Sequence, residues 1–97
     1  MLSLKDLRLY FCPAIINSIF MIDDFEQYRP VSKARIEFCL DYFKTLEAKM
    51  NCFGDVKKIV AFFERMKRSE EIPADDIDKA DGAVHELKMH WDRWVMA

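Results

Sequence analysis

Apolar residues recur at helical spacing along most of the chain. The clearest run lies in the C-terminal third, from about residue 75 to residue 95, and consists of Ile77, Ala80, Val84, Leu87, Trp91 and Trp94. Such a stripe is typical of an amphipathic helix that packs one face against its neighbours. Aspartates crowd the first turn of this segment, where the helix dipole favours carboxylates, and Asp75 is the expected N-cap.

Two segments in the middle of the chain repeat the pattern. The first follows Ser32, its expected N-cap, and ends at Gly54. Its apolar seam consists of Ile36, Cys39, Phe43, Leu46, Met50 and Phe53. The second starts at Asp55, another expected cap, and its seam consists of Val56, Ile59, Val60, Phe63 and Met66. The connections are short, so neighbouring helices are expected to run antiparallel.

The first thirty residues predict helix less uniformly. Ser3 and Asp6 have the spacing of a capped first turn. Apolar residues alternate over 7–11 as they would in a strand, but no second strand is apparent that could pair with it. Pro13 lacks a backbone donor, so a kink or break is expected just before it, followed by a fresh helix to about Tyr28.

Composition places the chain among folded proteins with one domain. It has 97 residues, of which 52% are hydrophobic and 33% charged, with two glycines and three prolines. These proportions exclude a disordered tail or a linker, and a chain of this length supports one core. We therefore expect a single helical domain over residues 1–97. The expected fold is all-α, a compact antiparallel bundle of four helices, or of five if the residues before Pro13 form a short extra N-terminal helix.

No motif of a known catalytic, nucleotide-binding or metal-binding site is present in the sequence. Two glycines are too few for a phosphate-cradling loop, and His85 and His90 point to different faces of one helix. The acidic run before Gly82 fails as a calcium loop, because Ile77 and Lys79 would fall at ligand positions. The sequence therefore predicts a non-enzymatic protein with no cofactor, no metal and no small-molecule substrate.

The cysteines and the longest uncharged run indicate the cellular compartment of the chain. Cys12, Cys39 and Cys52 are odd in number and far apart, which favours free thiols in a reducing compartment. The uncharged run over residues 9–22 is shorter than the roughly 20 residues that a membrane span needs. It also lacks a signal-peptide cleavage site. We expect a cytoplasmic protein with no membrane partner.

Residues 14–22 carry more apolar surface than one face of a small bundle needs. This stretch is hydrophobic nearly all round, and a helix of that kind is either central or covered by another chain. Other apolar residues lie off the predicted seams, and exposed aromatics and methionines mark protein contacts. The expected partner-binding residues are Phe20, Phe38, Tyr42, Met89 and Met96, with an acidic rim of Asp75, Asp76 and Asp78.

A protein-binding module is the leading functional hypothesis. Such a chain inhibits, regulates or adapts a larger partner, as small phage or mobile-element inhibitors do. The apolar excess suits a homodimer as well, and the sequence does not separate the two. The alternative is a nucleic-acid-associated regulator whose basic third helix contacts phosphates through Lys57, Lys58, Arg65 and Arg68. The net charge of −2 makes nucleic acid the less favoured partner.

Overall fold

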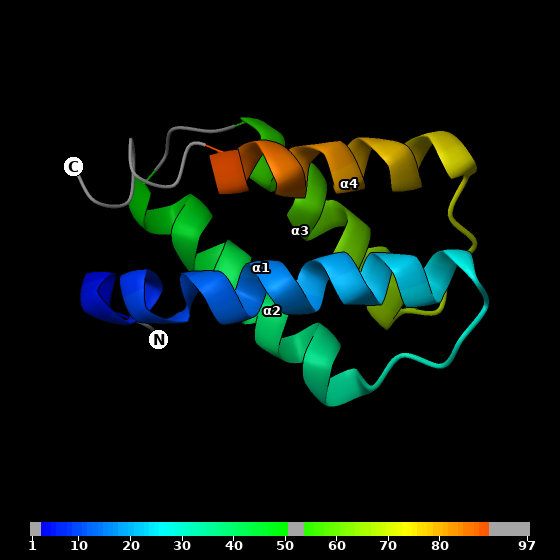
Figure 1. The fold of residues 1–97 in the computed structure, drawn as a ribbon, viewed down its shortest axis with the longest axis horizontal. Helices are drawn as coiled ribbons and strands as arrows, with labels where there is room; N and C mark the ends of the chain where they lie inside the picture. Colours follow the sequence, from blue (N-terminus) through cyan, green and yellow to red (C-terminus); the bar gives the residue numbers. More distant parts are fainter. Residues whose placement is uncertain (1–2, 51–53, 90–97) are drawn as a thin grey trace.

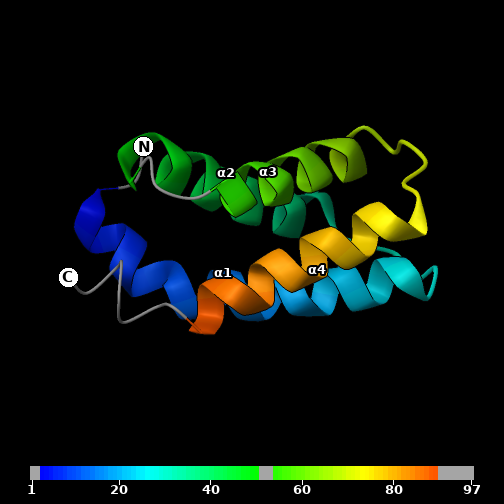
Figure 2. The same cartoon turned by 90° about the horizontal axis from the view of Figure 1, so that it is seen from above.

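The computed structural model describes residues 3–50 and 54–89, and these fold into four α-helices. The helices are α1 (Leu4–Glu26), α2 (Lys33–Met50), α3 (Gly54–Lys67) and α4 (Ala74–Met89). Each helix packs against the next, and α4 packs back against α1, which closes the bundle. Figures 1 and 2 show two layers, α1 with α4 and α2 with α3, in which consecutive helices run in opposite directions. The expected all-α bundle of four helices is confirmed.

The first two helices begin where the sequence predicts. The Ser3 hydroxyl accepts the Asp6 N–H at 3.2 Å, and the Asp6 carboxylate accepts the Ser3 N–H at 3.1 Å, which is a capping box. These bonds from Ser3 hold the pKa of Asp6 below its ordinary value. At the start of α2 the Arg35 N–H donates to the Ser32 hydroxyl at 3.3 Å. Both expected N-caps are confirmed.

The other two expected N-caps are wrong. α3 begins at Gly54, the residue expected to end the preceding helix, and α4 begins at Ala74, so Asp55 and Asp75 lie inside the first turns. In α4 the carbonyl of Pro73 accepts the N–H groups of Asp76 and Ile77, at 3.0 and 3.2 Å. Proline suits this position because an N–H at a helix start has no helical partner to lose.

Pro13 does not divide the N-terminal segment, so the short extra helix is wrong. α1 is one helix of 23 residues with Pro13 inside it. Its missing N–H leaves the carbonyl one turn earlier without a helical donor, and the exposed position of Pro13 lets water reach that carbonyl. One turn later, Asn17 and Ser18 donate back to the carbonyls of Pro13 and Ala14, at 2.8 and 2.7 Å, and bonds of this kind bend helices. Figure 2 shows the first turns of α1 inclined to the rest.

The predicted seams form the core. The seam residues buried in the described part of the chain are Ile36, Cys39, Phe43, Leu46, Val56, Ile59, Phe63, Met66, Ala80, Val84 and Leu87. Phe43 of α2 and Phe63 of α3 stack at a centroid distance of 6.2 Å, and Phe62 meets Phe63 edge-on at 5.5 Å. Phe62 was not predicted, because α3 touches α2 and α4 and so buries more than a single seam.

Ion pairs join the helices at the surface. Lys44 of α2 lies 2.8 Å from the Glu64 carboxylate of α3, and this lysine lowers the pKa of Glu64. Arg65 of α3 lies 2.8 Å from Asp76 of α4. These side chains are partly exposed, so each pair contributes at most about 1 kcal/mol to the free energy of unfolding. The pairs align the helices, but the apolar core supplies most of the stability.

Candidate protein-binding site

The α1–α2 connection (27–32) and the α3–α4 connection (68–73) lie at the same end of the bundle, on the right in Figure 1. A groove of about 500 Å³ opens between them, which we call the loop-end groove. Its apolar lining consists of Phe25, Pro30, Ile72 and Ile77, and its polar lining includes Glu26, Tyr28, Arg29 and Glu71. A second hollow of about 270 Å³ shares part of this lining and extends the groove to Ala74 and Asp78.

The helix ends beside the groove fix the conformation of Tyr28. The Tyr28 N–H donates to the Phe25 carbonyl at 3.2 Å, and the Arg29 N–H donates to the Asp24 carbonyl at 2.8 Å, which together form a Schellman motif. Tyr28 accordingly has a φ of 58°, a left-handed conformation that usually belongs to glycine. α3 ends in the same way, with Ser69 at a φ of 57°.

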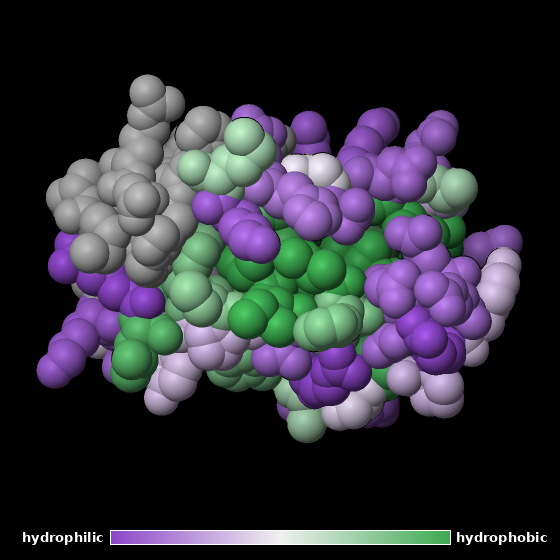
Figure 3. All heavy atoms as spheres, in the orientation of Figure 1, coloured by the Kyte–Doolittle hydropathy of each residue, from purple (hydrophilic) through white to green (hydrophobic). Residues whose placement is uncertain are grey.

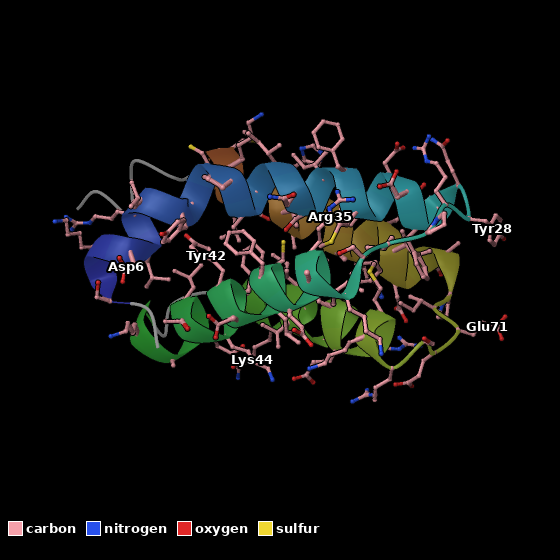
Figure 4. All side chains as sticks on the ribbon, turned by 90° about the horizontal axis from the view of Figure 1, so that it is seen from below. Asp6, Tyr28, Arg35, Tyr42, Lys44 and Glu71 are labelled. Carbon is pink, nitrogen blue, oxygen red and sulfur yellow. The ribbon has the colours of Figure 1, made fainter. Side chains whose placement is uncertain are left out.

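The Tyr28 side chain makes no buried packing contact that would offset this strain. Its side chain is 97% exposed and projects from the end of the molecule (Figure 4). A left-handed conformation costs an ordinary residue roughly 1–2 kcal/mol. Strained residues of this kind cluster at ligand clamps and other functional sites. The stability of the fold therefore does not explain why a tyrosine, and not a glycine, occupies position 28.

Three carboxylates border the groove without a compensating charge. Within the described part of the chain, Glu26, Glu71 and Asp78 form no ion pair. The nearby Arg29 is already held by two aspartates of α1, at 2.7 and 2.9 Å. The rim of the groove is consequently negative, and a cationic group is its electrostatic complement.

The predicted acidic rim is divided by the structure. Asp75 and Asp78 are exposed, but only Asp78 borders the groove. Asp76 is half-buried, and its carboxylate accepts a bond from Arg65. The groove adds Glu26 from α1 and the exposed Glu71, which the sequence did not single out because these residues lie far apart along the chain. The one local sequence signal for this site was Tyr28, an aromatic residue between the end of α1 and Pro30.

The apolar residues predicted to contact a partner also differ in their exposure. Phe20 is 58% exposed and Met89 is 80% exposed, so both are available to a partner. Figure 3 shows a hydrophobic area in the middle of the face on which α1 and α4 lie. Phe38 is half-buried and meets Tyr10 edge-on at 6.2 Å. Met96 lies outside the described residues.

Tyr42 does not lie on the surface, so the prediction that it contacts a partner is wrong. Its side chain is fully buried and reaches from α2 toward α1 (Figure 4). There the Tyr42 hydroxyl donates to the Leu7 carbonyl at 2.9 Å, which satisfies both buried groups. Burial raises the pKa of the Tyr42 phenol above its ordinary value. α2 packs between α1 and α3, so a residue off its seam is buried as well.

The basic residues of α3 are only partly available. Lys57 and Lys58 are exposed. Arg65 is bound to α4 as described above, and it also donates to the Glu71 carbonyl at 2.9 Å. Arg68 forms an ion pair with its neighbour Glu70. Arg65 and Arg68, which were expected to contact phosphates, thus already hold acidic side chains of the same chain.

The cysteines differ in their surroundings. Cys12 is exposed, whereas Cys39 is buried with its Sγ 3.8 Å from the Ala14 carbonyl. Burial raises the pKa of the Cys39 thiol. The thiolate is the reactive form of cysteine, so a raised pKa keeps Cys39 protonated and unreactive. The residue therefore acts in the core as a small apolar side chain. Cys52 lies outside the described residues.

Comparison with known proteins finds no family model, no curated protein and no solved structure that matches this chain. In the described residues, no three histidine, cysteine or acidic side chains gather where they could hold a metal ion. None of the four helices combines the length and the apolar character that crossing a membrane requires.

Proposed function

We propose that this chain is a non-enzymatic protein-binding module whose loop-end groove takes a basic and apolar segment of a larger partner, which it thereby inhibits, regulates or adapts. The observation that carries the proposal is Tyr28, a strained and almost fully exposed aromatic residue beside an apolar groove. Tyrosine is enriched at protein-binding hot spots, because it offers a large contact area and loses little conformational entropy on binding.

The lining of the groove defines the chemistry of the segment it binds. A leucine, methionine or phenylalanine side chain enters between Phe25, Ile72 and Ile77, and the Tyr28 ring closes over it. Lysine or arginine side chains on either side of that residue meet the carboxylates of the rim. The apolar anchor provides most of the affinity, and the charges provide orientation and a faster encounter.

The alternative of a nucleic-acid regulator has less support. The net charge is −2, and Arg65 and Arg68 are engaged with acidic partners within the chain. Binding to a phosphate backbone needs several available cations at once, because it is driven by the release of counterions. A hollow of about 180 Å³ beside Lys58 is lined by three cations, Lys58, Arg65 and Lys79, but Arg65 there is held by Asp76.

Replacing the strained tyrosine separates binding from stability. We expect Tyr28→Gly to raise the free energy of unfolding by about 1 kcal/mol, because glycine adopts a positive φ without a Cβ clash. We expect the same variant to lose affinity for its peptides by about tenfold or more, since a hot-spot ring is removed. Peptides selected from a random phage-displayed library against the full chain serve as probes, with affinity measured by fluorescence anisotropy and stability by urea denaturation.

The chain offers a matched control for this experiment. Ser69→Gly relieves the same left-handed strain at the end of α3, and Ser69 does not line the groove. It is expected to raise stability by a similar amount and to leave peptide affinity unchanged. Equal peptide binding by wild type and Tyr28→Gly would show that the groove is not the binding site.

Reversing the rim charges tests the basic character of the partner. We expect the double variant Glu26→Lys and Asp78→Lys to weaken binding of lysine- or arginine-containing peptides by about tenfold or more at low salt, with a smaller effect at high salt. The control is Asp41→Lys with Glu86→Lys, which makes the same change in net charge at exposed sites that do not line the groove. Selection of peptides without basic residues, or equal losses in both double variants, contradicts the acidic-rim proposal.

A further inference from the structure

The outer face of α1 carries an apolar stripe that the bundle leaves uncovered. Leu9, Ile16 and Phe20 are 65%, 53% and 58% exposed, and Pro13 between them is exposed too. Their spacing of i, i+4, i+7 and i+11 places all four on one side of the helix. The stripe is roughly 16 Å long at the usual helical rise.

Charges at the two ends of this stripe have opposite signs. Lys5 lies on the N-terminal side, and Asp23 lies on the C-terminal side. A second α1 laid across the first in the same direction would bring like charges together at both ends. Laid in the opposite direction, it brings each basic end against an acidic end, and the two helix dipoles are then also opposed. The stripe is therefore complementary to an inverted copy of itself.

We propose that this face binds a second copy of the chain, with the two α1 helices antiparallel about a two-fold axis. Such an interface is isologous, since one patch contacts the same patch on the other copy. The centre of the stripe falls between residues 14 and 15. Pairing about that point sets Leu9 against Phe20 of the second copy and Pro13 against Ile16 of the second copy. The same register brings Lys5 beside Asp23 of the second copy, whose carboxylate is 54% exposed even in its ion pair with Arg29.

Met89 extends the contact beyond α1. It is the last residue of α4 and is 80% exposed, and the end of α4 lies beside the first half of α1 in both Figure 1 and Figure 2. None of the stripe residues lines the loop-end groove. The dimer and the proposed binding of a basic segment are therefore separate properties of the chain, and either can fail without the other.

Sedimentation equilibrium of the full chain tests the dimer. We expect the wild type to be dimeric at about 10–100 µM, the range of a moderately tight complex. Ile16→Asp should raise the dissociation constant at least about 100-fold, because the two-fold axis places a buried charge in the interface twice. Ala61→Asp adds the same charge at an exposed position of α3 and should leave the dimer intact. Circular dichroism of each variant reports whether it folds.

Two charge variants test the antiparallel orientation of the two α1 helices. Lys5→Glu and Asp23→Lys should each weaken self-association by about tenfold at low salt, because each places like charges at both ends of the interface. An equimolar mixture of the two variants should recover most of the wild-type affinity, since both ends of the mixed interface again carry opposite charges. A wild type that is monomeric at about 100 µM, an Ile16→Asp variant that remains dimeric, or a mixture that recovers nothing overturns the proposal.

Discussion

Phe63→Ala is expected to lower the free energy of unfolding by about 3–5 kcal/mol. Phe63 is fully buried, stacks on Phe43 across the α2–α3 contact and touches Phe62, so truncation leaves a cavity between α2 and α3. A chain of this size has a total stability of roughly 5–15 kcal/mol, so the variant is close to unfolding at room temperature. Urea denaturation followed by circular dichroism measures the loss.

Two further variants make this result specific. Phe63→Leu keeps most of the buried volume and should lose markedly less stability than the alanine variant. Phe20→Ala makes the same truncation on the exposed face of α1, and at a concentration low enough to keep the chain monomeric it should cost about 0.5 kcal/mol or less. Similar losses for Phe63→Ala and Phe20→Ala would contradict the core described above.

Alkaline pH is expected to destabilise the bundle through Tyr42. The pKa of its phenol is raised in the folded state by burial, whereas the unfolded chain has the ordinary value of about 10. The folded state therefore retains a proton that the unfolded state loses. The stabilising contribution of this group is complete below about pH 10 and falls as the pH rises above it, by about 1.4 kcal/mol per pH unit. Ionisation also removes the donor to the Leu7 carbonyl.

Tyr42→Phe isolates this contribution. At neutral pH the variant should be about 1–2 kcal/mol less stable than the wild type, because the buried hydrogen bond from the Tyr42 hydroxyl to the Leu7 carbonyl is lost. Above about pH 10 the difference should shrink and then change sign, since phenylalanine has no proton to lose. Cys39, whose pKa is also raised, is present in both chains and cancels in the comparison. Parallel pH profiles for the two chains would exclude Tyr42 as the titrating group.

The sequence predicted those features of the fold that depend on local spacing. Its seams became the core, and the caps at Ser3 and Ser32 form as expected. It did not predict the burial of Tyr42 and Phe62, because a seam marks only one face of a helix, whereas α2 and α3 each bury a second face. At Pro13 it predicted a kink or a break, and the structure has the kink, since α1 continues through Pro13 and bends there.

The candidate site was less accessible to sequence reasoning. The loop-end groove joins two connections about forty residues apart, and only the topology of the bundle brings them together. The left-handed turns at Tyr28 and Ser69 carry no glycine, which is the usual sequence signal for a Schellman motif. Of the predicted contact residues, Phe20 and Met89 are exposed as expected, and Asp78 borders the groove. Their assignment to a partner stays a prediction.

The loop-end groove lies at the C-terminal end of α1, and this position has a consequence for the number of targets one assembly can hold. When two α1 helices pair antiparallel, their C-terminal ends point away from each other, so the grooves are separated by about the length of α1, roughly 35 Å. If both proposals hold, we expect such a pair to be bivalent. It would then tether two copies of a target, or two segments of one target joined by a long linker, with an avidity that depends on the spacing of those segments rather than on any new contact.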